Sequence, residues 1–256
     1  MKTVLLCGSP KKRLSASAFL MILAAFFIGG EKTFVAIPTV PSRYDPILDE
    51  LKGADNLLFA MPLYVDGVPG HVLAFLEALE AFAKEEDLHP RVWVVVNNGF
   101  IEGRQNAPLM AIMENFSAAC GFSFMGGLGI GGGVMLNVIR ILLAAQFFLM
   151  LILIFAGYLA EGRWIVKEPA ENFLLNLLIN GALASAALLE LISLARHIRR
   201  QKDFGTKYTR ILLPAFVFIP VADIFFFIAS FLQGGLFRGR TEKKKPTDAY
   251  LKRRMD

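Results

Sequence analysis

The chain has 256 residues, 55% of them hydrophobic, and a mean hydropathy of +0.52. These values are high for a soluble domain and predict membrane segments. The net charge of +5 divides into −3 for residues 1–137 and +8 for residues 138–256, which predicts two differently solvated halves. Two cysteines and three histidines, without metal-ligand spacing, exclude a CxxC centre and predict no metal site.

The chain opens with a short apolar strand, Val4–Leu6, and a loop of small and basic residues, Gly8 to Arg13. The apolar run 18–28 follows, and we expect a helix there rather than a cleaved signal, because a strand precedes the charges. A strand, a small-residue loop and a helix start place backbone N–H groups around an anion. The loop lacks the Walker A and dinucleotide glycine patterns, so it predicts either a mononucleotide phosphate site or an ordinary turn.

Apolar strands and amphipathic helices then alternate along the chain. The predicted strands are 33–37, 56–61, 92–96 and 122–125, and the predicted helices are 44–51, 69–86 and 107–120. Five strands alternating with helices predict an α/β fold with a parallel sheet. Because ligands bind beyond the carboxyl ends of such strands, the loops there form the candidate site. The last of them, Gly126–Gly133, is either a ligand loop or a linker.

These loops carry a recognisable pattern in a fixed order. Its parts are Gly8-Ser9-Pro10 with Ser15 and Ser17, Met61-Pro62-Leu63-Tyr64, the helix opened by Pro69-Gly70, and Asn97-Asn98-Gly99-Phe100. Residues 1–133 thereby resemble the NAD(P)H-dependent FMN reductases of the flavodoxin-like fold. The resemblance implies a doubly wound, five-stranded parallel sheet of order 2-1-3-4-5.

The resemblance also implies a cofactor, FMN, and a co-substrate, NAD(P)H. The implied binding residues are Ser9, Pro10, Ser15, Ala16 and Ser17 at the phosphate, Pro62, Leu63, Tyr64 and Val65 at the isoalloxazine ring, and Asn97, Asn98, Gly99 and Phe100 at its pyrimidine edge. The flavin itself accepts hydride, so no catalytic acid or base is implied. Alternatively, Tyr64 is an exposed loop aromatic, and Asn97 and Asn98 only cap a turn.

Residues 134–237 form a predicted helical membrane region. Its candidate segments, 139–160, 173–195 and 211–237, are each long enough to cross a hydrocarbon core of about 30 Å. The alternative for each segment is a buried core helix. The connector 196–210 is strongly basic and 161–172 is not, so the positive-inside rule places 161–172 outside and 196–210 inside with the first domain.

The basic tail, residues 238–256, conflicts with three simple crossings, which would leave it outside. A re-entrant third segment, bent at Pro214 or Pro220, would resolve the conflict. Asp223 in that segment is either a functional intramembrane acid or a structural one paired with Arg140 or Lys207. We expect the tail to meet anionic lipid headgroups rather than nucleic acid.

These patterns together predict a multi-pass cell-membrane protein with a cytoplasmic flavin domain. Its predicted function is that of an FMN-dependent oxidoreductase, which takes hydride from NAD(P)H and passes electrons to a quinone, a flavin or another small-molecule acceptor. The alternative is a non-catalytic flavodoxin-like electron carrier or flavin-sensing module that docks onto a membrane partner. The expected partners are the lipid bilayer and the acceptor, with no nucleic acid, and a homo-oligomer stays open.

Overall fold

A computed structural model describes residues 1–11 and 15–232. The chain forms two compact units, Met1–Leu213 and Pro214–Asp256. Lys12 and Arg13 of the first loop, and the basic tail 238–256, lie outside the described residues.

The first unit is built on a parallel sheet of six strands. They are β1 (Lys2–Cys7), β2 (Glu31–Ala36), β3 (Asn56–Pro62), β4 (Arg91–Asn97), β5 (Ser123–Gly131) and β6 (Gly205–Arg210), in the spatial order β2-β1-β3-β4-β5-β6. The first five strands have the predicted order, and the predicted number of five is wrong. The sixth strand was missed because it is a polar, mostly exposed edge strand without a buried apolar run.

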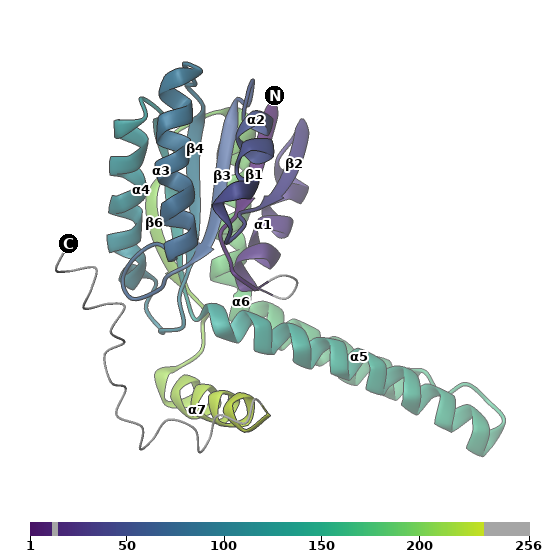
Figure 1. The fold of residues 1–256 in the computed structure, drawn as a ribbon. Coiled ribbons are helices and arrows are strands. Elements are labelled where there is room, and N and C mark those ends of the chain that lie inside the picture. The colour runs from purple at the N-terminus through teal and green to yellow at the C-terminus, as the bar shows by residue number, and fades with distance from the viewer. Residues whose placement is uncertain (12–14, 233–256) are drawn as a thin grey trace. The chain divides into compact units, whose positions relative to one another are not determined.

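Helices cover both faces of this sheet (Figure 1). The helices of the first unit are α1 (Ala16–Phe27), α2 (Asp45–Glu50), α3 (Gly70–Glu85), α4 (Ala107–Ala119), α5 (Gly133–Glu161) and α6 (Lys167–Arg200), with 3-10 turns η1 (Pro41–Arg43) and η2 (Gly103–Asn106). Residues of α2, α3 and α4 pack into one core with β1, β3 and β4. On the other face α1 packs against α6 and the central strands.

The central strands are buried along their whole apolar runs. Leu57–Met61 and Val92–Val96 are fully buried, as expected for parallel strands covered on both faces. Trp93, Phe59 and Phe75 are the largest fully buried side chains, and burying each contributes roughly 1.5–3 kcal/mol. This core fixes the strand ends at which the candidate site lies.

The glycine run 126–133 is neither a loop nor a linker over most of its length, because β5 extends to Gly131. Its glycines allow neighbouring chain to approach closely. A Cβ atom on Gly129 would lie 2.6 Å from Tyr208 Cδ1 of β6 and 3.1 Å from the Gly103 carbonyl oxygen. Sequence alone could not distinguish this packing from flexibility.

The connection from β5 to β6 is a long helical hairpin, α5 followed by α6. Side chains of α6 are buried only in its second part, at Ala184, Ala187, Leu191, Leu194, Ala195 and Ile198. Within the segment 173–195, predicted as a membrane span, residues 184–195 therefore pack one face on the sheet layer. The small residues there allow close packing on the protein instead of on a neighbouring membrane helix.

Within residues 1–11 and 15–232, three helices are long and apolar enough to cross a membrane: α5, α6 and α7 (Ala215–Leu232). Helix α7 belongs to the second unit and contains Pro220 in its interior. Lys207, one of the two partners considered for Asp223, forms an ion pair with Glu190 instead, at 3.2 Å.

We expect both cysteine thiols to be unreactive towards thiol reagents in the folded protein. Burial raises the pKa of the Cys7 thiol and raises that of Cys120 from 9.0 to about 11. We expect neither to react with a maleimide at pH 8 until the protein is unfolded, as counted by mass spectrometry.

The same burial predicts a loss of stability in alkali. The unfolded thiol of Cys120 ionises near 9.0 and the folded one near 11, so its contribution is complete below pH 9 and lost as the pH rises to about 11. Melting temperatures at pH 8 and pH 10.5 would measure this loss, and the melting temperature of Cys120→Ala should fall less between these two pH values.

Maleimide labelling of both thiols in the folded protein, at the rate seen in the unfolded protein, would contradict the burial on which both predictions rest.

Candidate functional site

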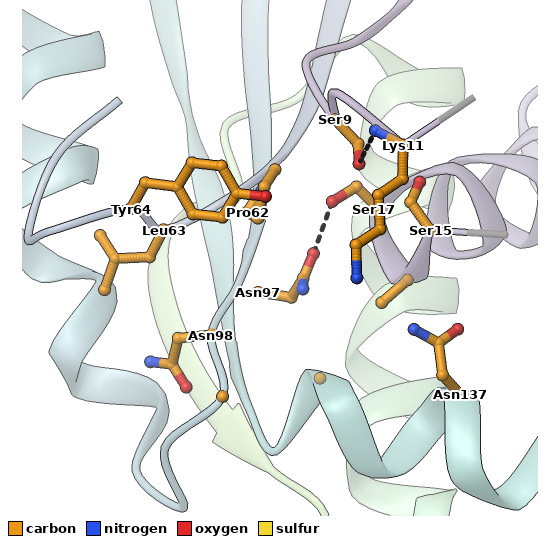
Figure 2. Close-up of a pocket in the computed structure, with 13 residues that line it drawn as sticks. Ser9, Lys11, Ser15, Ser17, Pro62, Leu63, Tyr64, Asn97, Asn98 and Asn137 are labelled. Carbon is orange, nitrogen blue, oxygen red and sulfur yellow. Dashed lines mark hydrogen bonds between the residues drawn. The ribbon is translucent and has the colours of Figure 1, made fainter. Parts of the chain in front are cut away.

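A cleft opens at the carboxyl ends of β1, β3 and β4, with a cavity volume of about 140 Å³ (Figure 2). The chain passes from β1 to β2 on one side and returns to β3 on the other, so this is the switch point of the sheet. The predicted residues that line it are Ser9, Ser15, Ala16, Ser17, Pro62, Leu63, Tyr64, Asn97, Asn98 and Gly99. The structure adds Lys11, Gly133 and Asn137 to this lining.

The first wall of the cleft is the start of α1. Gly8 lets the loop pass close to α3, since a Cβ there would lie 2.7 Å from Val72 Cγ2. Ser15 is the N-cap residue, and its hydroxyl oxygen accepts a hydrogen bond of 3.1 Å from the Ala18 amide. Its hydroxyl also forms a hydrogen bond with the Cys7 thiol, whereas the first amides of a helix have no intrahelical partner. This end of α1 can therefore donate to an anion.

Ser17 and Asn97 connect this wall to the end of β4. The Ser17 hydroxyl donates to Asn97 Oδ1 at 2.7 Å, and both side chains are buried. Ser17, predicted as a phosphate donor, thus has its hydroxyl proton already engaged. Its expected role at a phosphate would fall to its backbone amide, or would require the Asn97 bond to break.

The opposite wall is the apolar end of β3. Pro62, Leu63 and Tyr64 line the cleft, and Tyr64 is 43% exposed. A tight turn follows, in which Val65 and Asp66 both have positive φ, 48° and 56°, as in a type I′ turn. This turn directs Val65, predicted to lie against the ring, into solvent at 100% exposure.

Asn98 holds the loop after β4 together. Its amide nitrogen donates to the Glu102 carbonyl at 3.1 Å, and its Oδ1 accepts from the Phe100 amide at 3.1 Å. The side chain therefore makes the turn cap that was the alternative for this residue. Phe100 is 54% exposed and lies outside the cleft lining, as does Pro10, which borders a neighbouring cavity of about 740 Å³ with Ser9 and Lys11.

Two of the added residues, Gly133 and Asn137, belong to the first turns of α5. A Cβ atom on Gly133 would lie 2.7 Å from Asn97 Nδ2, so only glycine fits against the end of β4. The Asn137 side chain lines the cleft, and its Oδ1 is buried without a hydrogen-bond partner among the described residues. The signal for Asn137 in the sequence is a single side-chain amide at the start of a long apolar helix.

Two helix N-termini and a lysine make the cleft electropositive. The N-terminal ends of α1 and α5 both meet it, Lys11 projects into it, and none of its described lining residues is acidic (Figure 2). No group of three or more His, Cys, Asp or Glu residues within 1–11 and 15–232 is placed to hold a metal ion. An anionic ligand with a flat, partly apolar body suits these walls best.

No protein-family description matches this sequence, and no curated protein matches it. Solved structures with a similar fold include a NADPH-quinone reductase from P. pentosaceus, at 16% identity and a TM-score of 0.44, covering 52% of this chain and 86% of that one. An azoreductase from Bacillus anthracis str. Sterne has 11% identity and a TM-score of 0.45, covering 77% of this chain and 99% of that one. The Trp repressor binding protein from Bacillus subtilis has 18% identity and a TM-score of 0.41, covering 51% and 84%. Values this low establish neither a family nor an activity.

Ser15→Ala should separate the phosphate end of the cleft from the rest. If FMN is the ligand, as the resemblance implies, its affinity should fall about tenfold. The affinity for riboflavin, which lacks the phosphate, should change little. Losing the N-cap should also destabilise the protein by about 1 kcal/mol. Fluorescence titration of both ligands measures the difference.

Ser123→Ala is the matched control. Ser123 is exposed at the start of β5 and therefore lies at the amino ends of the strands, whereas the cleft lies at their carboxyl ends. Equal losses of FMN and riboflavin affinity in Ser15→Ala would show that Ser15 acts only through the shape of the cleft.

Proposed function

We propose that the protein is a membrane-anchored, FMN-dependent oxidoreductase, which takes hydride from NAD(P)H and passes electrons to a small acceptor such as a quinone. The observation that carries the proposal is the composition of the switch-point cleft. One wall offers hydroxyl and amide donors at a helix N-terminus, the opposite wall is apolar and aromatic, and buried amides lie between them. A flavin mononucleotide needs these three features in this order.

The residues present fit such a group at both of its ends. Ser9, Ser15 and the amides that open α1 would hold the phosphate, with Lys11 balancing its charge. Pro62, Leu63 and Tyr64 would contact the ring, and the orphaned Asn137 Oδ1 would accept a hydrogen bond from its polar edge.

The cleft is smaller than the roughly 300–1,000 Å³ of most ligand pockets, so the proposed cofactor would extend beyond it. The half-exposed Tyr64 ring, at the mouth, would cover part of the exposed portion. When bound, the flavin supplies the hydride chemistry, and the chain's own contribution is to orient it and leave one ring face accessible. No side chain in the cleft is assigned a proton-transfer role.

Membrane anchoring is proposed from the exposed surface of the long helices. Between Ile141 and Leu159 every exposed side chain of α5 is apolar or aromatic, and most are large; none of the hydrophobic window of this helix is buried. A surface of this extent is not stable in water. We propose a cytoplasmic location for the sheet domain, where NAD(P)H is available.

The absorbance of the detergent-purified full chain tests the proposal. We expect oxidised flavin bands, bleaching when NADPH or NADH is added without oxygen, and recolouring when a quinone is added. Bands that neither nucleotide bleaches would favour the electron carrier or flavin sensor. A colourless protein that takes up no added FMN would contradict both functions.

A further inference from the structure

Helices α5 and α6 pack side by side as an antiparallel hairpin beyond the sheet. Their half-buried residues recur every three or four positions and form one seam: Leu143, Gln146, Met150, Ile154 and Gly157 in α5, and Phe173, Asn176, Asn180 and Leu183 in α6. Outside the seam most side chains of the hairpin are apolar and exposed, for example Phe148 at 63% and Leu159 at 70%. Hydrocarbon is the surrounding that such a surface requires.

The register of the hairpin is offset. Trp164 stacks on Tyr158 with ring centroids 4.4 Å apart, so the chain already runs back along α5 before α6 begins. Phe173 meets Phe147 with centroids 5.7 Å apart. A small cavity of about 80 Å³ confirms this register, because Pro169, Asn172, Phe173 and Asn176 line it together with Gln146, Leu149, Met150 and Leu153.

This register places charged residues halfway along the hairpin. Lys167, Glu168 and Glu171 open α6 and lie at the level of Leu149 to Leu153. That level is roughly 12–18 Å along α5 from Ile141, where its exposed apolar surface begins. In a hydrocarbon core of about 30 Å, two full crossings would put these three charges at the centre of the bilayer. Charges there are costly and rare.

Polar groups in fact occur at every level of the hairpin. At the base the Arg140 guanidinium lies over the Phe19 ring of α1, 5.0 Å from its centroid. Next comes Gln146, whose Oε1 is buried without a hydrogen-bond partner in the described part of the chain. The charged start of α6 follows, and the tip carries the Glu161–Arg163 ion pair of 2.8 Å.

Two crossings would bury the charged start of α6 in hydrocarbon, whereas a hairpin held in one leaflet keeps these charges within reach of the headgroups. There Lys, Glu and Trp side chains can extend to the headgroups while the apolar side chains of α5 enter the acyl layer. Helix α5 leaves the carboxyl edge and runs out to one side of the sheet (Figure 1). This direction suits a hairpin lying along a surface that the carboxyl edge faces.

We propose that the α5–α6 hairpin lies within the near leaflet of the bilayer instead of crossing it twice. The inference rests on the membrane anchoring proposed above. It keeps residues 161–171 on the same side as the sheet domain, whereas the charge pattern of the sequence places 161–172 outside. The cleft then opens at headgroup level, because Asn137, which lines it, precedes Ile141 by about one helical turn.

Labelling of one introduced cysteine at a time in the full chain tests this topology. Arg163→Cys reports the hairpin tip, and Glu85→Cys, exposed at the end of α3, reports the sheet domain. The native Cys7 and Cys120 are buried and need not be removed. A membrane-impermeant maleimide is applied to intact cells and to inverted membrane vesicles, and labelling is normalised to that in detergent.

We expect both cysteines to be labelled in the same preparation, with at least tenfold less labelling in the other. Labelling of Arg163→Cys and Glu85→Cys from opposite sides would establish two crossings and overturn the inference. Labelling of Arg163→Cys only after detergent would place the tip in hydrocarbon and also overturn it. Neither result touches the anchoring itself, which would fail instead if the wild-type chain were recovered outside the membrane fraction.

Discussion

Two short hydrogen bonds hold the start of the α5–α6 hairpin against the loop that follows β4. The amides of Gly132 and Gly133 donate to the carbonyl oxygens of Phe100 and Asn98, at 2.6 and 2.7 Å. Gly132 has a φ of +75°, which starts the first turn of α5 directly against the end of β4. One junction thus shapes the cleft and sets the direction in which the apolar hairpin leaves the domain.

The hairpin is an elaboration of an ordinary crossover connection. A parallel β5–β6 pair needs a helix that returns along the face of the sheet, and the second half of α6 supplies it. The remainder, α5 and the first half of α6, is additional chain that extends from the carboxyl edge. Because its base is continuous with the site, membrane attachment and ligand binding share the same few residues in the account proposed above.

Much of the fold could be predicted from the sequence, because it depends on local apolar patterns. The buried runs of β3 and β4 and the amphipathic α3 identify themselves, and the strand order followed from a family resemblance. Strand β6 could not be found, since an exposed edge strand with Lys207 and Arg210 has the composition of a basic connector. The packing of residues 184–195 on the sheet was equally hidden, because small apolar residues suit a protein interior and a membrane alike.

The site shows the same division. Residues of the strand-end loops, such as Ser15, Pro62 and Asn97, could be placed near one another because parallel strands end at one edge. Their binding roles stay a prediction from the resemblance. Asn137 was missed because it is distant in sequence and reaches the cleft only through the β5–α5 junction. Val65 lies outside the cleft lining, a position that depends on two positive φ angles in its turn, which cannot be predicted from the dipeptide Val-Asp.

The most direct measurement of the shared junction is the FMN affinity of Gly133→Ala in the full chain. The added Cβ would meet Asn97 at 2.7–3.1 Å, and overpacking of this kind costs about 1–3 kcal/mol. If the displaced Asn97 transmits this cost to the cleft, FMN should bind about 5- to 150-fold more weakly. Gly181→Ala, where nothing lies within 4 Å of the new Cβ, should bind FMN as the wild type does. Unchanged FMN affinity in both variants would contradict a cleft built on the start of α5.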